Sequence, residues 1–176
     1  MIFRETPLSG AYLIEMDPIR DGRGFFARTY CRETFAAKGL NPHIEQCNLS
    51  YNRRRGTIRG MHFQREPYAE AKLVHCIRGA IYDAIIDLRP QSATYKRWFA
   101  VTLTGYDRIM LYVPEGFAHG FQTLQDHTEV MYQMSRAYHP EASAGIRWND
   151  AQFQIEWPLE CTVISGRDRS YPEYAP

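Results

Sequence analysis

The stretch from Gly56 to Leu73 contains three side chains suited to proton transfer and anion binding. His62 lies three residues after Arg59, and Lys72 follows a polar loop. An imidazole is a natural proton acceptor near neutral pH because its unperturbed pKa is about 6.5. An ammonium group beside it stabilises the oxyanion that forms when a carbon acid loses its proton. Taken alone, His62 also fits a hydrogen-bonded core histidine, and Lys72 fits a surface lysine.

His119 and Tyr132, further along the chain, are additional candidates for the same pocket. His119 lies in the run Y-V-P-E-G-F-A-H-G-F at 112–121, and Tyr132 lies in a predicted strand among polar residues. A tyrosine that faces a histidine base across a substrate can return a proton to the opposite face. Packing of Tyr132 in the core or at its rim is the alternative.

The histidines raise the question of a metal site. Jelly-roll metal sites usually present two histidines as H-x-H, then a nearby glutamate and a distant third histidine. Here the motif at 62–64 reads H-F-Q, and Glu66 and Glu70 fall in a predicted loop. Glutamine is a poor substitute for an imidazole, so His62 and His119 form a weak metal site. We predict no bound metal, with a metal-dependent enzyme as the alternative.

Cationic side chains suited to a phosphate are numerous. The sequence contains no Walker or G-x-G-x-x-G loop, so side chains rather than a helix N-terminus would hold a phosphate. The candidates are Arg23, Arg53 to Arg55, Arg59, Lys72 and Arg167.

The elements that position these residues are predicted to be short β-strands. Turn signals recur every 8 to 12 residues, which is typical of a sandwich or barrel. The expected strands are 11–16, 25–30, 44–50, 57–64, 72–78, 80–88, 97–103, 109–113, 120–124 and 128–136. One short helix is expected over 32–38, closed by Gly39, and the irregular C-terminal part is expected to wrap the β-core.

Strand geometry complicates the grouping of Arg59 with His62. Side chains alternate between the two faces of a strand, so these residues would point apart. Gly60 lies between them and can host a β-bulge, which would turn both side chains to one cavity.

Composition excludes several classes of protein. The net charge of +1 gives no basic field for nucleic acid, and no apolar run approaches the ~20 residues of a membrane span. The N-terminus lacks a signal-peptide profile, so we expect a single cytoplasmic domain over 1–176. The cysteines, at 31, 47, 76 and 161, show no C-x-x-C spacing and are expected to be free thiols.

Taken together and in order, the motifs resemble those of the dTDP-4-dehydrorhamnose 3,5-epimerases, metal-free members of the cupin superfamily. The similarity covers nearly the whole chain. The matching segments are 21–26 (D-G-R-G-F-F), 46–50 (Q-C-N-L-S), 58–64 (I-R-G-M-H-F-Q), 72–74 (K-L-V), 83–89, 113–121, 148–150 (W-N-D) and 157–158 (W-P). The resemblance implies an all-β, cupin-type jelly-roll sandwich with a few short peripheral helices, and an isomerase that needs no cofactor.

The family's substrate is a nucleotide diphospho-4-keto-6-deoxyhexose, whose C4 carbonyl acidifies the hydrogens at C3 and C5. The resemblance implies that His62 removes these protons, that Asp168 pairs with its ring and that Tyr132 donates a proton from the opposite face. Lys72 matches the lysine beside the enolate oxygen, and Asp83 is expected near the His62 ring.

Other residues match substrate contacts of the family. They are Arg23, Arg28, Gln46, Asn48, Arg59, His119, Tyr138, Ser143 and Arg167, with arginines on the diphosphate and Tyr138 stacked on the base. Arg28 and Ser143 stand where the family usually has glutamate, and Cys47 replaces an aspartate. The nucleotide base is therefore left open. An epimerase that inverts one carbon only, on another nucleotide sugar such as a CDP-sugar, is the alternative.

The family also implies a partner subunit. Its N-terminal strands cross to a neighbouring chain, so a homodimer is expected, with Arg23 serving the neighbour's pocket. No nucleic acid or membrane partner is expected.

Overall fold

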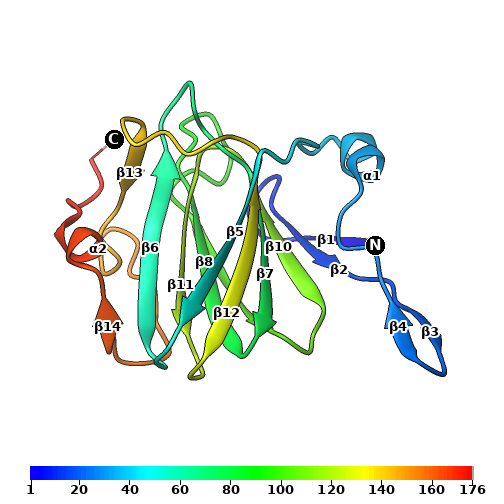
Figure 1. Ribbon diagram of the computed structural model, residues 1–176. Coiled ribbons are helices and arrows are strands. Elements are labelled where there is room, and N and C mark those ends of the chain that lie inside the picture. The colour runs from blue at the N-terminus through cyan, green and yellow to red at the C-terminus, as the bar shows by residue number, and fades with distance from the viewer. Residues whose placement is uncertain (176) are drawn as a thin grey trace.

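Residues 1–175 fold into two β-sheets packed face to face, with a hairpin and two short helices at the periphery (Figure 1). This computed structural model describes residues 1–175. The first sheet has the order β1 (Ile2–Glu5), β2 (Tyr12–Glu15), β10 (Ile109–Val113), β7 (Lys72–Arg78), β12 (Thr128–Met134), β5 (Gln46–Asn52). The second has the order β13 (Ser143–Gly145), β6 (Thr57–Gln64), β11 (Phe117–Thr123), β8 (Ala80–Asp87), β9 (Trp98–Thr104), and β14 (Val163–Ile164) also pairs with β6.

Strands β5 to β12 form a jelly roll. Strands β5, β7, β10 and β12 belong to the first sheet, whereas β6, β8, β9 and β11 belong to the second. All their pairings are antiparallel. The predicted all-β sandwich is thus confirmed.

The core between the sheets draws on both. Val74, Leu111 and Val130 from the first sheet pack with Ile81 and Phe121 from the second, all buried. Full burial of such a side chain contributes about 1.5–3 kcal/mol. Toward one end, polar side chains replace this apolar layer, and the candidate site lies there.

The C-terminal part covers the outer face of the second sheet, as expected. Ile146 and Phe153 pack on Met61, Ala84 and Ala118, in an apolar cluster separate from the one between the sheets. Strand β8 is consequently buried on both faces, which explains its nearly continuous apolar sequence. The same wrapping carries α2 (Gly166–Ser170) to the outer edge of β6 (Figure 1).

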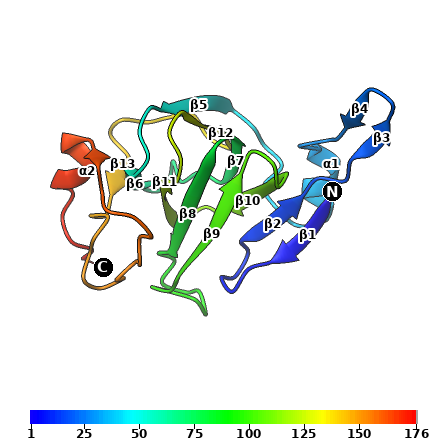
Figure 2. The same ribbon diagram turned by 90° about the horizontal axis from the view of Figure 1, so that it is seen from below.

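The N-terminal elements lie at the opposite end of the molecule. The hairpin of β3 (Ile19–Asp21) and β4 (Gly24–Phe26) projects beyond the sandwich together with α1 (Arg32–Ala37) (Figure 2). The expected strand 25–30 is thus shorter and begins one residue earlier. Gly39 has φ 71°, the left-handed conformation expected at the end of α1. Of the helices in residues 1–175, none has the length and apolarity needed to cross a membrane.

Strand β6 contains the expected bulge. Its register with β11 pairs His62 with His119 and Arg59 with Phe121, which leaves one extra residue on β6. Gly60 supplies the special backbone at this point, with φ 131°. Arg59 and His62 therefore both reach the cavity between the sheets.

Candidate active site

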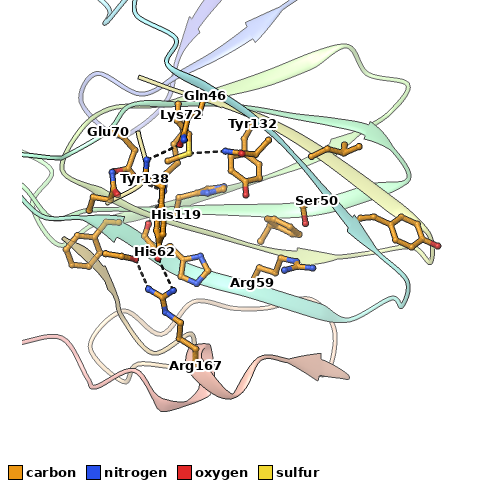
Figure 3. A pocket seen from close by; sticks show the side chains of 18 residues that line it. Gln46, Ser50, Arg59, His62, Glu70, Lys72, His119, Tyr132, Tyr138 and Arg167 are labelled. Carbon is orange, nitrogen blue, oxygen red and sulfur yellow. Dashed lines mark hydrogen bonds and ion pairs between the residues drawn. The ribbon is translucent and has the colours of Figure 1, made fainter. Parts of the chain in front are cut away.

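A cavity of about 540 Å³ lies between the two sheets. One wall comes from β5, β7 and β12 and the other from β6 and β11, so residues distant in sequence face one another (Figure 3). The lining residues are Gln46, Asn48, Leu49, Ser50, Tyr51, Arg59, His62, Phe63, Gln64, Glu70, Lys72, His119, Phe121, Tyr132, Met134, Tyr138, Ser143 and Arg167. Ten of the predicted site residues belong to this set: His62, Lys72, Tyr132, Gln46, Asn48, Arg59, His119, Tyr138, Ser143 and Arg167.

His62 and Asp168 form a dyad in the wall of the cavity. His62 Nε2 lies 2.7 Å from Asp168 Oδ1, and the Gly60 N–H donates to Asp168 Oδ2 at 3.2 Å. Burial raises the pKa of the Asp168 carboxyl, but the interactions with His62 and the Gly60 N–H outweigh it and hold the pKa below its usual value. Asp168 is therefore ionised at neutral pH and accepts a hydrogen bond from the Nε2–H group of His62. Nδ1 is the ring nitrogen of His62 that this pairing leaves without a side-chain hydrogen bond.

Tyr132 lies on the other sheet, on β12, and its side chain points into the same cavity as His62 (Figure 3). Burial raises the pKa of the Tyr132 phenol, and the charge of Arg59 offsets only part of that rise. The hydroxyl thus carries its proton at neutral pH. A base and a neutral acid face one cavity from opposite sheets, an arrangement suited to proton removal on one face of a substrate and return on the other.

Lys72 is buried beside the dyad. Its Nζ lies 3.0 Å from Glu70 Oε1 and donates to the backbone oxygen of His62 at 3.2 Å. Glu70 Oε2 is buried and has no hydrogen-bond partner within residues 1–175. An ammonium in a cavity of this kind stabilises a developing oxyanion. Glu70 was not predicted as a site residue, although side chains two apart on an extended segment share a face.

His119 has a dyad of its own. Its Nε2 lies 2.7 Å from Asp83 Oδ1, and both side chains are buried. Asp83 was expected near the His62 ring, and the structure places it on His119 instead. The reason is strand order: β11 lies between β6 and β8, and Asp83, whose cross-strand partner is Phe121, is the diagonal neighbour of His119.

The outer end of the cavity carries the residues expected at the nucleotide. Arg167 donates to Ser143 Oγ at 2.6 Å and to the Tyr138 hydroxyl at 3.4 Å (Figure 3). This second bond lowers the pKa of Tyr138. The Tyr138 backbone N–H donates to Gln46 Oε1 at 2.9 Å. An arginine, an amide and an exposed aromatic ring thus converge at one rim.

Arg23 and Arg28 lie outside the cavity of their own chain. Arg23 is on the projecting hairpin, where its exposed guanidinium pairs with Asp21 at 2.5 Å. Arg28 borders a separate depression of about 300 Å³, with neighbours that include Ile19 and Phe26. Within one chain, these two predicted contacts do not join the others.

The described part of the chain contains no cluster of side chains suited to coordinate a metal ion. Among residues 1–175, no group of three or more His, Cys, Asp or Glu side chains is placed to hold a metal ion. His62 and His119 each pair with an aspartate instead. The cysteines are all free, and the expectation of free thiols is confirmed.

Comparison with known proteins decides the family. The sequence model described as dTDP-4-dehydrorhamnose 3,5-epimerase matches residues 5–175. The chain belongs to the dTDP-4-dehydrorhamnose 3,5-epimerase family. The family predicted from the motifs, its cupin-type fold and its isomerase class are confirmed.

Individual members of this epimerase family are similar to the chain over almost its whole length. The dTDP-4-dehydrorhamnose 3,5-epimerase of Methanothermobacter thermautotrophicus is 43% identical over 172 residues, 96% of this chain and 92% of that protein. The Bacillus anthracis epimerase structure, described with TDP and PPi bound, has a TM-score of 0.93 and 41% identity, covering 98% of this chain and 99% of that one. The Legionella pneumophila structure, in complex with dTDP-4-keto-L-rhamnose, has a TM-score of 0.89 and 29% identity, covering 99% of both chains.

Proposed function

We propose that this chain inverts C3 and C5 of dTDP-4-dehydro-6-deoxy-D-glucose and so forms dTDP-4-dehydro-L-rhamnose. The observation that carries the proposal is the His62–Asp168 dyad facing Tyr132 across one cavity that also holds Lys72. The C4 ketone acidifies the hydrogens at both neighbouring carbons, since either carbanion delocalises as an enolate. A base, an acid and a cation are then enough for the reaction.

His62 begins each inversion. Nδ1 takes the proton from C3 or C5, the C–H electron pair moves into the enolate, and the imidazole becomes an imidazolium. Asp168, ionised and bonded to Nε2, stabilises that positive charge. Lys72 lies close to the same residue, through its bond to the His62 backbone oxygen, and supplies positive charge to the enolate oxygen.

Tyr132 completes the inversion. Its phenol gives a proton to the carbon from the opposite face, and the enolate collapses to the ketone. The tyrosinate and the imidazolium then exchange protons with water, which restores both groups for the second carbon. The raised pKa of Tyr132 favours this role because it keeps the donor protonated at neutral pH.

The remaining lining residues are proposed to hold the nucleotide. Arg59 and Arg167 carry the positive charge for the diphosphate, and the exposed ring of Tyr138 offers a surface for the base. Gln46, Asn48, Ser143 and His119 supply hydrogen-bonding groups to the sugar and base. The protein is proposed to work in the cytoplasm.

A homodimer is proposed to complete the site. The projecting hairpin exposes Ile19, Phe25 and Phe26, at 71%, 48% and 67% of their surface. Large apolar side chains clustered on a protruding element favour an interface. A partner that receives this hairpin would gain Arg23 and Arg28 near its own cavity.

Proton exchange in D2O tests the proposal. We expect deuterium at C3 and at C5 when the protein is incubated with dTDP-4-dehydro-6-deoxy-D-glucose, followed by both inversions in the NMR spectrum. His62→Asn should abolish exchange, whereas His43→Asn, a change at an exposed histidine outside the cavity, should not. Exchange at one carbon would make the chain a single-site epimerase. No exchange with dTDP, UDP, CDP or GDP sugars would refute the proposal.

A further inference from the structure

Tyr171, at the end of α2, packs against the proposed base. Its ring centroid lies 5.9 Å from that of His62, with the planes at 69°, an edge-to-face contact. The Arg167 guanidinium lies 5.7 Å from the centre of the same ring. The Tyr171 hydroxyl is buried and has no hydrogen-bond partner within residues 1–175. Burial also raises the pKa of this phenol, so the group facing His62 is a neutral aromatic ring.

Gly145 makes room for this ring. It pairs directly with His62 in the β13–β6 register. A Cβ atom at position 145 would lie only 2.3–2.6 Å from three ring carbons of Tyr171. Any other residue at this position would therefore push the aromatic ring away from the imidazole. A glycine and a tyrosine from distant parts of the chain together create the contact with His62.

The backbone on both sides of Tyr171 is tied down. Asp168 N–H donates to Ser165 Oγ at 3.0 Å at the start of α2. After the helix, the Pro172 carbonyl accepts a hydrogen bond from the Arg147 N–H at 3.2 Å. The ring is thus fixed to the same short segment that delivers Asp168 to His62.

His62 needs a second contact to hold its orientation. The side chain is 41% exposed to the cavity, and only its Nε2 atom is held by a side-chain hydrogen bond. A single bond at one ring atom leaves the imidazole plane free to turn about it. A neighbouring ring packed edge-to-face restricts that turn, and aromatic pairs of this geometry are favourable.

We propose that Tyr171 is a positioning residue for the reaction: its ring, admitted by Gly145, fixes the imidazole plane of His62 so that Nδ1 faces the substrate. The effect of Tyr171 on catalysis rests on the proposed function of His62 as the base. The contact itself is a property of the protein without substrate. Tyr171 acts through His62 and does not reach the cavity lining.

The test compares three variants of the full chain. Tyr171→Ala should lower kcat for C3 and C5 exchange by about tenfold or more with little change in KM, because misorientation of a reacting group costs rate rather than binding. Tyr171→Phe should restore the rate, since it keeps the ring that contacts His62. Tyr174→Ala is the matched control: this tyrosine lies in the same tail, packs on Phe153 and shares a hydrogen bond with the Tyr95 hydroxyl.

An NMR measurement separates this inference from the proposed function. The ring nitrogen signals of His62 should shift or broaden in substrate-free Tyr171→Ala and stay unchanged in Tyr171→Phe and Tyr174→Ala. If Tyr171→Ala does not fold, Tyr171→Leu takes its place with the same expectation. Unchanged His62 signals, or an equal loss of kcat in Tyr174→Ala, would overturn the role of Tyr171. An inactive wild-type protein with shifted signals in Tyr171→Ala would instead overturn the proposed function.

Discussion

Gly60 and Asp168, 108 residues apart in the chain, are joined by a hydrogen bond from the glycine N–H to the carboxylate at 3.2 Å. The bulge that turns Arg59 and His62 to one cavity therefore also aims a backbone donor at the aspartate that orients His62. One irregular residue in β6 thus helps to place Arg59, His62 and the carboxylate that pairs with His62.

Gly60→Ala should destabilise the fold. The residue has φ 131°, and a Cβ atom there would lie 2.5 Å from the Cα atom of Gly120 on β11. We expect the free energy of unfolding to fall by about 2–4 kcal/mol, measured by urea denaturation. Gly22→Ala is the control, because its Cβ would meet no atom within 4 Å. Equal midpoints for the two variants would contradict the strained role of Gly60.

Asp168→Asn should remove most of the activity while leaving the substrate site intact. The amide keeps the shape of the carboxylate but loses the charge that stabilises the His62 imidazolium. We expect kcat to fall by about 10²–10⁴-fold, the range associated with loss of acid–base catalysis, with a small change in KM. Asp126→Asn, at a loop carboxylate that binds the Arg55 N–H, should behave like wild type. A kcat within threefold of wild type in Asp168→Asn would argue against the dyad.

The strands could be predicted where turn residues bound them on both sides. Strands β6, β7 and β10 match the expected ranges 57–64, 72–78 and 109–113. By contrast, β1, β13 and β14 were not predicted. Each has two to four residues and pairs at a sheet edge with a partner that only the folded chain supplies.

The site could be predicted only in part for the same reason. Residue type and spacing suggested His62 and Lys72, but the pairing of His62 with Asp168 spans 106 residues and came from the family resemblance alone. Asp83 was assigned to the wrong histidine because strand order is not visible in the sequence. Tyr171 was missed because its contact depends on the space left by Gly145, which no local pattern reveals.

Metal removal should leave the activity unchanged. His62 and His119 are each paired with an aspartate, and their proposed roles use the imidazoles as a base and a substrate contact. We expect purified protein to contain less than about 0.1 equivalent of any transition metal and to keep full activity after dialysis against a chelator. Loss of activity on chelation, restored by one divalent ion, would favour a metal-dependent enzyme.

Tyr132→Phe should separate proton removal from inversion. The variant keeps His62, Asp168 and Lys72, so the C3 and C5 hydrogens should still exchange with D2O. It lacks the donor on the opposite sheet, so protonation from that face should slow by about 10²-fold or more, and most of the deuterated sugar should keep its original configuration. NMR of the sugar ring reports both events in one experiment. Tyr112→Phe is the control, because this buried tyrosine bonds the Asn41 N–H in a separate cluster and should change stability only. If Tyr132→Phe gave inverted product at the wild-type rate, the second proton would have to come from another group, and the opposed arrangement of His62 and Tyr132 would not explain the stereochemistry.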